Sequence, residues 1–320
     1  MIKLERLKNA ISSRGISLYW HVTFSFCCMI EKIKNRKATN EEIKKRAFFR
    51  LPKAKGKIRK TQLAQLGLLK EVKQVCDKNG ILFTLDGGTL LGAIRHRGFI
   101  PWDDDVDIRM SYDDYEKFKA VVADNERIEV NNYYNYCFGY KLIKVKYKAT
   151  EAFFVDIFPY EHVQVAKEDE KEKAKKLVCQ KSNELNEMNL KYLHEDSDLS
   201  SATVKGAPVK SKYVDSKYEQ EKQTVLSCFP QYGEGNWIIS SVENSMPEYQ
   251  RAIYPMEECF PIVKDALYFE GMTFNMLKNE EQYLNDLYGD YLSLPTRAAP
   301  VHSMELKKGL KEALIKISEE

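Results

Sequence analysis

The chain has 320 residues, of which 43% are hydrophobic and 12% aromatic, so it can bury a sizeable core and is not of the disordered class. Its 50 basic and 47 acidic side chains leave a net charge of +3, too small a bias to indicate a nucleic-acid partner. Seven cysteines without a CxxC pair fit no common zinc site and indicate free thiols in a reducing, cytoplasmic compartment.

The N-terminal segment, residues 1–60, is basic and contains one apolar stretch at 16–30, ISLYWHVTFSFCCMI. That stretch is shorter than the ~20 apolar residues that span a bilayer, and it lacks the cleavage site of a signal peptide. It is either a helix packed on the main domain or, because basic residues flank it, a helix at the inner face of an anionic membrane. Residues 31–60, interrupted by Pro52 and Gly56, predict a solvated linker.

From residue 61 the sequence alternates between helical and strand periods, which predicts an α/β (α+β) core over 61–160. The region 161–320 predicts a mainly helical C-terminal extension that completes the substrate site. The expected core elements are a helix over 61–80 with Thr61 as N-cap and Gly80 as stop, a strand over 81–85, a short helix after 88, a strand over 101–108, a helix capped by Ser111, strand structure over 137–149, and a strand over 151–160 stopped by Pro159.

Four aspartates lie within residues 102–108, WDDDVDI. Two carboxylates about 4 Å apart repel by roughly 4 kcal/mol at an effective dielectric of ~20, so either water solvates them or a cation is bound. In a strand, Asp103, Asp105 and Asp107 share one face, roughly 7 Å between successive members. The apolar neighbours Trp102, Val106 and Ile108 argue against a solvated acidic turn. Hard oxygen ligands at this spacing suit Mg²⁺, which completes its octahedron with substrate phosphates.

A further acid, Asp156, lies inside the apolar strand FFVDIF, where an unpaired charge is costly. If that strand lies beside 102–108, Asp156 completes a three-carboxylate site. Upstream, DGGTLLG at 86–92 places glycines at a strand end, where backbone amides can hold phosphate oxygens. Along the chain, a glycine turn is followed by the aspartate segment and then by a strand with a single acid. This is the layout of nucleotidyltransferase-fold enzymes, in which two metals bridge the phosphates and stabilise the attacking and leaving oxygens.

Residues 86–108, DGGTLLGAIRHRGFIPWDDDVDI, closely resemble the signature of the LicD family, which includes the fukutin-like proteins. The resemblance covers 61–160 and, more weakly, 255–302. It implies a nucleotidyltransferase-like mixed sheet flanked by helices. It also implies a phosphotransferase that moves phosphocholine or a phosphopolyol from a CDP-linked alcohol donor to a sugar hydroxyl of a glycan or glycolipid. Bacterial members modify lipopolysaccharide, teichoic acid or capsule.

On the matching positions, the resemblance implies Mg²⁺, with Mn²⁺ as an alternative, held by Asp105, Asp107 and Asp156. Asp156 is also a candidate base for the acceptor hydroxyl, and Asp86 is the other, unless Asp86 only makes an Asx-turn. The residues expected to bind substrate are Gly88, Thr89, Asp104, Arg95, His96 and Lys144. For Asp104, Arg95 and His96, ordinary solvation is the competing role.

Other candidates lie outside the main motif. Trp102 is expected to pack in the core, with cation–π attraction to a choline ammonium as the alternative. Residues 288–290 are expected to close the site from the C-terminal side, and His302 is expected to be an ordinary surface or core residue. Two other functions remain open: nucleotidyl transfer that releases pyrophosphate, and a catalytically silent binding protein of the same fold. The sequence does not identify the transferred group, the acceptor or the oligomeric state.

Overall fold

The computed structural model describes residues 2–164, 167–199, 208–227, 236–241, 253–255, 262–299 and 310–319. The helices are α1 (Ile2–Lys34), α2 (Asn40–Arg50), α3 (Gly56–Asn79), α4 (Gly87–His96), α5 (Tyr112–Ala123), α6 (Glu168–Glu195), α7 (Lys212–Leu226), α9 (Glu280–Tyr288) and α10 (Leu310–Glu319). The strands are β1 (Phe83–Leu85), β2 (Asp107–Ser111), β3 (Ile128–Asn135), β4 (Lys141–Tyr147), β5 (Phe154–Val163), β6 (Pro208–Val209), β7 (Trp237–Ser240), β8 (Ile253–Pro255), β9 (Val263–Phe269) and β10 (Met272–Met276).

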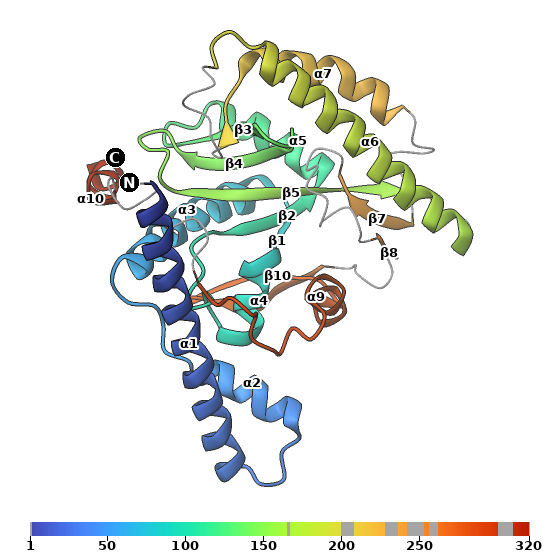
Figure 1. Ribbon diagram of the computed structural model, residues 1–320. Coiled ribbons are helices and arrows are strands. Elements are labelled where there is room, and N and C mark those ends of the chain that lie inside the picture. The colour runs from blue at the N-terminus through green and yellow to red at the C-terminus, as the bar shows by residue number, and fades with distance from the viewer. Residues whose placement is uncertain are drawn as a thin grey trace.

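The described strands form one mixed sheet, which confirms the expected α/β class. Its order is β6-β3-β4-β5-β2-β1-β10-β9, and β7 pairs with the far end of β5 and with β8. The β2–β5 and β1–β10 pairs are parallel, whereas the other pairs are antiparallel. The helical C-terminal part therefore also supplies strands, because β10 and β9 extend the sheet beyond β1. In Figure 1, α6 and α7 lie together at one end of the molecule, and α1 and α2 form a stalk at the other.

The centre of the sheet is buried on both faces. Val106, Ile108, Val155 and Ile157 are fully buried beside the aspartates of β2 and β5. Burial of each such side chain stabilises the fold by roughly 1.5–3 kcal/mol, so the apolar residues fix the register of the acidic ones. The site described below therefore lies beside fully buried core residues.

The prediction of a solvated linker over 31–60 is wrong. Residues 40–50 form α2, which begins with a capping box between Thr39 and Glu42. Phe48 of α2 is fully buried, and its ring lies 4.3 Å, centroid to centroid, from that of Phe24 in α1. The many basic residues concealed the apolar face of a short helix. Because that face packs on α1 and α4, α2 belongs to the folded domain.

Two predicted boundaries also differ. Helix α3 begins at Gly56, and the Thr61 hydroxyl donates to the carbonyl of Lys57 instead of capping the helix. Gly80 ends α3 with φ of 65°, as expected. Pro159 does not stop β5, which continues to Val163. The ring removes one backbone donor, but the flanking residues keep pairing with β2, and the Pro159 carbonyl accepts from the backbone of Ser241.

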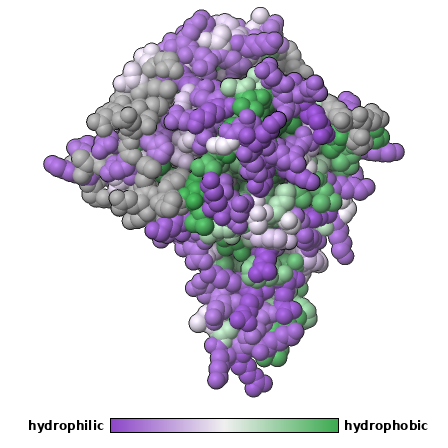
Figure 2. Space-filling model, turned by 180° about the vertical axis from the view of Figure 1, so that it is seen from behind, coloured by the Kyte–Doolittle hydropathy of each residue, from purple (hydrophilic) through white to green (hydrophobic). Residues whose placement is uncertain are grey.

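Cys27, Cys28, Cys76 and Cys137 are free thiols, as expected. None of the described helices combines the length and the apolar character that crossing a bilayer requires. Figure 2 shows a surface that is mostly hydrophilic, with apolar areas between the charged side chains.

Candidate active site

Three acidic residues meet where β1, β2 and β5 lie side by side. Asp86 follows the last residue of β1, and its N–H donates to the carbonyl of Asp107, the first residue of β2, at 3.0 Å. Asp107 is directly opposite Asp156 in the parallel β2–β5 pair. The Asp156 N–H donates to the carbonyl of Val106 at 2.8 Å. The prediction that the Asp156 strand lies beside the aspartate segment is therefore confirmed.

The prediction of a strand over 101–108 is wrong for residues 101–106. The strand begins only at Asp107, and the preceding segment is irregular. Two glutamines of α3 hold this segment: the Gln62 amide donates to the carbonyls of Ile100 and Asp103 at 3.1 and 2.8 Å, and the Gln65 amide donates to that of Asp104 at 2.7 Å. These bonds replace the ladder of a neighbouring strand. The carboxylates of this segment are therefore aimed by α3 and not by strand alternation.

The carboxylates nevertheless lie close enough to affect one another's pKa. Burial, the charge of Asp105 and a hydrogen bond with Asp105 raise the pKa of Asp103 well above its usual range. Burial raises the pKa of Asp107 in the same way, with further contributions from the charges of Asp105, Asp156, Asp103 and Asp86. The ionised forms of Asp103 and Asp107 are thus disfavoured by burial and by their acidic neighbours. This concentration of negative charge is the main electrostatic feature of the site.

One compensating cation is Lys144 of β4, whose Nζ donates to both oxygens of Asp156 at 2.7 and 3.0 Å. The two residues are also opposite in the β4–β5 register, and the ammonium lies 3.4 Å from the centroid of the Phe154 ring. Lys144 therefore stabilises the Asp156 carboxylate directly. Its expected contact with donor phosphates stays a prediction.

A second cation, Arg109 of β2, holds Asp86. Its Nε donates to Asp86 Oδ2 at 3.1 Å, and its Nη2 donates to the Tyr283 hydroxyl at 2.7 Å. The Tyr283 hydroxyl in turn donates to Asp86 Oδ1 at 2.5 Å. All three side chains are buried. Asp86 makes no side-chain cap of α4, so its carboxylate is fixed by this triad and not by an Asx-turn.

Sequence reasoning missed both partners of Asp86. Arg109 carried a signal, because an arginine between apolar residues of a core strand needs an acidic partner. Tyr283 lies 197 positions from Asp86 along the chain and belongs to α9, so no local pattern indicated it. The buried glutamines Gln62 and Gln65 were likewise missed, although polar residues at positions i and i+3 of a buried helix face are unusual.

The start of α4 lies against the same acids. The Thr89 hydroxyl accepts from the backbone N–H of Asp107 at 2.9 Å, which ties α4 to β2. Gly87 has φ of 49°, and a Cβ on Gly88 would lie 2.7 Å from Asp103 Oδ2. No side chain caps the first turn of α4. The sequence therefore needs glycine here so that the positive end of a helix can approach the acidic segment closely.

Arg95 and His96, at the end of α4, are engaged inside the protein. Arg95 Nη1 donates to the carbonyls of Tyr291 and Ser293 at 2.8 and 3.2 Å, and burial lowers the Arg95 pKa to about 10. Burial and the charge of Arg95 lower the His96 pKa well below its usual value. The His96 ring lies edge-on to that of Phe48. Both side chains hold the fold, and a substrate contact by either stays a prediction.

The remaining candidates differ in their placement. Trp102 packs in the core, with its ring centroid 5.4 Å from that of Trp20. Asp104 is buried. Tyr288 is 43% exposed as a whole residue, but burial around its hydroxyl and the charges of four aspartates, Asp107 first, raise its pKa. Asp290 instead pairs with Lys44 at 2.9 Å. His302 lies outside the described residues.

Within the described part of the chain, no group of three His, Cys, Asp or Glu side chains is already arranged to hold a metal ion. The donor chemistry nevertheless fits a hard divalent cation, because the aspartates supply only oxygen ligands and their mutual repulsion is what such an ion relieves. Asp156 instead pairs with Lys144 at 2.7 Å. A metal would have to share Asp156 with that lysine or displace it.

Comparison with known proteins agrees with this arrangement. The family model described as LicD/FKTN/FKRP, nucleotidyltransferase domain, matches residues 80–195. The chain is 24% identical over 272 residues to the lipopolysaccharide cholinephosphotransferase LicD of Haemophilus influenzae, a match that covers 74% of this chain and 92% of that protein. Asp86, the acidic segment and Asp156 all lie within the matched domain.

Other relatives match over a shorter segment. The chain is 30% identical over 89 residues to the human ribitol 5-phosphate transferase FKRP, covering 27% of this chain and 18% of that protein. It is 37% identical over 82 residues to an uncharacterised protein of Rickettsia typhi, covering 24% of this chain and 26% of the other. These matches therefore concern one region of the chain and not its whole length.

Proposed function

The chain belongs to the LicD family, and from this premise we propose that it is a phosphotransferase that moves phosphocholine, or a related phospho-alcohol, from a CDP-activated donor to a sugar hydroxyl of a cell-surface glycan or glycolipid. The observation that carries the proposal is the meeting of Asp86, Asp107 and Asp156 on neighbouring strands, with the N-terminus of α4 beside them. The similarity to a lipopolysaccharide cholinephosphotransferase supports phosphocholine as the first group to test.

The start of α4 is the proposed site for the donor diphosphate. Its first-turn amides and the helix dipole favour an anion. The Asp103 carboxylate lies beside Gly88, so a donor phosphate at this position would have to displace it. A diphosphate there would lie next to the most acidic part of the protein. Such proximity is repulsive without a cation, which is why we expect the acids and the donor to bind together only when a divalent ion is present.

We expect that ion to be Mg²⁺, with Mn²⁺ as an alternative, held by Asp105, Asp107 and Asp156. When bound, it would neutralise charge on the phosphates and on the carboxylates. The chain's own residues then have separate tasks. Lys144 orients Asp156, and the α3 glutamines hold the loop that contains Asp105.

In the proposed reaction, an acceptor hydroxyl oxygen forms a bond to the distal phosphorus of the donor while the bond between that phosphorus and the CMP oxygen breaks. The hydroxyl proton goes to a carboxylate, for which Asp86 and Asp156 are the candidates. Asp86 is fixed by Arg109 and Tyr283, so it can hold an acceptor in one orientation. Asp156 is held by the ammonium of Lys144 at 2.7 Å.

The test is an assay of CMP release from CDP-choline, CDP-ribitol and CDP-glycerol with Mg²⁺ and a lipopolysaccharide or glycolipid acceptor. We expect release of CMP with one donor preferred, and loss of turnover by at least ~100-fold in Asp105→Asn. The matched control is Asp113→Asn, an exposed acid in the first turn of α5.

Release of pyrophosphate from a nucleoside triphosphate would instead identify a nucleotidyltransferase. Tight binding of a CDP-alcohol, seen as a thermal shift, without any turnover would identify a binding protein. Unchanged Mg²⁺-dependent turnover in Asp105→Asn would refute the metal role.

A further inference from the structure

Helix α1 has apolar side chains on two opposite faces. One face, with Trp20 and Cys27, is buried against the domain. The other carries six large apolar residues that are each at least half exposed: Leu18, Tyr19, Val22, Phe26, Met29 and Ile33. At 100° per residue these six positions fall within an arc of about 100°, so they form one continuous stripe along the helix. We call it the α1 stripe.

The α1 stripe is accessible. The helix and α2 project together from the body of the protein as a stalk, with the far end of α1 at its tip (Figure 1). Apolar surface is visible among the hydrophilic side chains of this stalk when the molecule is seen from behind (Figure 2). Single exposed apolar residues are ordinary, but a row of six on one helix face indicates a surface that something covers.

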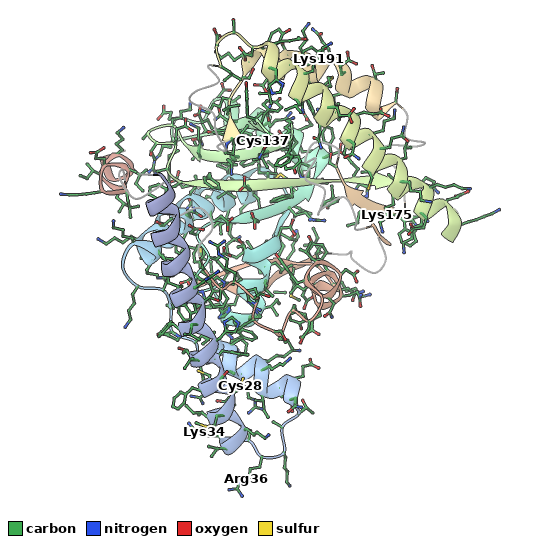
Figure 3. All side chains as sticks on the ribbon, in the orientation of Figure 1. Cys28, Lys34, Arg36, Cys137, Lys175 and Lys191 are labelled. Carbon is green, nitrogen blue, oxygen red and sulfur yellow. The ribbon has the colours of Figure 1, made fainter. Side chains whose placement is uncertain are left out.

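The charges around the stripe are almost all positive. Exposed basic residues border it at both edges and at its end: Arg14, Lys32, Lys34, Arg36 and Lys37. Between residues 14 and 40 the only acid is Glu31, which is buried and paired with Arg50. Lys34 and Arg36 extend outward from the tip of the stalk (Figure 3). A second copy of the chain would bring two such basic borders together, whereas an anionic surface would neutralise them.

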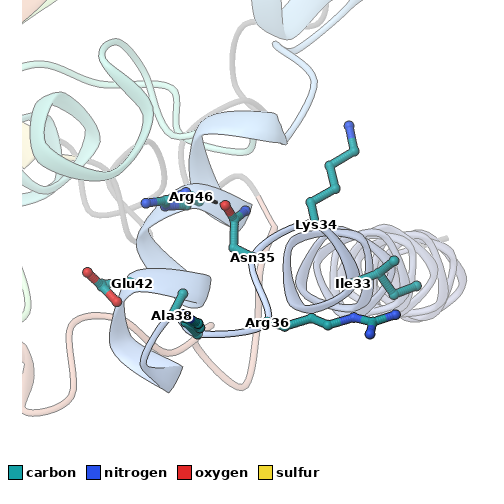
Figure 4. Close-up of a pocket in the computed structure, with 8 residues that line it drawn as sticks. Ile33, Lys34, Asn35, Arg36, Ala38, Glu42 and Arg46 are labelled. Carbon is teal, nitrogen blue, oxygen red and sulfur yellow. Dashed lines mark hydrogen bonds between the residues drawn. The ribbon is translucent and has the colours of Figure 1, made fainter.

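The tip also carries a basic hollow. A cavity of ≈ 590 Å³ lies between the end of α1 and the start of α2, lined by Ile33, Lys34, Asn35, Arg36, Lys37, Ala38, Glu42 and Arg46. Arg46 donates to the Asn35 side chain at 2.8 Å, which holds two polar residues in place (Figure 4). The hollow begins where the stripe ends, at Ile33. Apolar side chains and a cluster of cations thus meet at one place, as they do on helices that lie in a membrane interface.

We propose that the stalk binds an anionic phospholipid surface, with the α1 stripe inserted among the acyl chains near the headgroups and the basic residues of the tip on the lipid phosphates. The helix would then lie in the plane of the membrane and not cross it. This binding needs neither donor nor acceptor, so it stands or falls independently of the proposed transferase activity.

The experiment is flotation of the full chain with vesicles of phosphatidylcholine alone or of equal parts phosphatidylcholine and phosphatidylglycerol. We expect binding to the anionic vesicles that weakens in 0.5 M salt (a concentration at which exposed charges are screened within roughly 4 Å) and little binding to the neutral ones. Val22→Ser with Phe26→Ser should weaken binding by about 100-fold. The matched control, Val121→Ser with Phe138→Ser, changes exposed residues elsewhere and should leave binding unchanged.

A second variant tests the charges without touching any apolar contact. Lys34→Gln, Arg36→Gln and Lys37→Gln together should weaken binding on the order of 100-fold, while the same change at Lys176, Lys191 and Lys212 on α6 and α7 should not. Equal binding to neutral vesicles, or unchanged binding of either stalk variant, would overturn the proposal. So would a chain that ignores vesicles but forms a dimer that the stripe variant abolishes, because the stripe would then be covered by a second copy.

Discussion

Removal of the Tyr283 hydroxyl is the sharpest test of how the site is held. In Tyr283→Phe the ring stays in place, but the hydroxyl that donates to Asp86 at 2.5 Å and accepts from Arg109 at 2.7 Å is lost. Hydrogen bonds to charged groups contribute roughly 1.5–3 kcal/mol each, and a buried group that loses one cannot regain it from water. The side chains involved are all buried.

The free energies of the two hydrogen bonds of the Tyr283 hydroxyl do not simply add. Arg109 already donates to the other oxygen of Asp86 at 3.1 Å, and this ion pair can tighten when the hydroxyl is absent. We therefore expect a loss of about 2–4 kcal/mol in the free energy of unfolding. For a chain of this size, each kcal/mol lowers Tm by roughly 2 °C, so Tm should fall by about 4–8 °C.

The assay is thermal unfolding followed by circular dichroism, with Tyr268→Phe as the control because Tyr268 is half exposed on β9. A double-mutant cycle with Arg109→Met separates the triad from general packing, since the two substitutions should be strongly non-additive. Phosphotransfer should also fall more in Tyr283→Phe than in the control. A Tm within about 1 °C of the unmodified protein would refute the argument that α9 fixes Asp86 through this hydroxyl.

Three further outcomes follow from the site. Without divalent ions, Asp107→Asn should raise the free energy of unfolding by ~1–2 kcal/mol, because it removes one charge from a repelling cluster; equal stability would contradict that repulsion. With Mg²⁺ present, the same substitution should abolish turnover. The pKa of His96 is lowered in the folded state, so its contribution to the free energy of unfolding is complete above the unfolded pKa near 6.5 and declines as the pH falls. At pH 5 the free energy of unfolding of the unmodified protein, measured with urea, should therefore fall by about 2 kcal/mol more than that of His96→Phe. Gly88→Ala should lower turnover by at least ~10-fold because its Cβ would meet Asp103 at 2.7 Å, whereas Gly15→Ala, where the space is open, should change nothing measurable in the same assay.

The acidic residues themselves could be identified from the sequence, but part of the reason given for their convergence was wrong. Strand alternation was expected to align Asp103, Asp105 and Asp107, whereas only Asp107 is in a strand. Gln62 and Gln65 hold the preceding loop from α3. Their side chains take the place of the backbone partners that a neighbouring strand would supply. Such a contact has no sequence period, so the local pattern could not predict it.

Sequence patterns also gave wrong predictions of which residues face the core in α2 and α3. Residues 31–60 were expected to be a linker because lysine and arginine dominate their composition, yet three apolar side chains of α2 are buried. In α3, Leu63 is exposed while Gln62 and Gln65 are buried, the reverse of what apolar periodicity indicates. Both errors arise because burial depends on what packs against a helix and not on its own composition.

What the sequence determined by itself is the set of chemical groups and the strands that carry them. Glycines before a short helix, an aspartate segment and an acid in an apolar strand are local features, and burial of the apolar neighbours fixes their register. Which groups hold these side chains depends on the tertiary fold. Tyr283, Lys144 and the α3 glutamines lie on α9, β4 and α3, and Arg109 of β2 reaches Asp86 across the neighbouring strand, so these hydrogen bonds are set by packing. The Tyr283–Asp86 pair is separated by 197 positions and follows no sequence period, so it can be identified only from the folded structure.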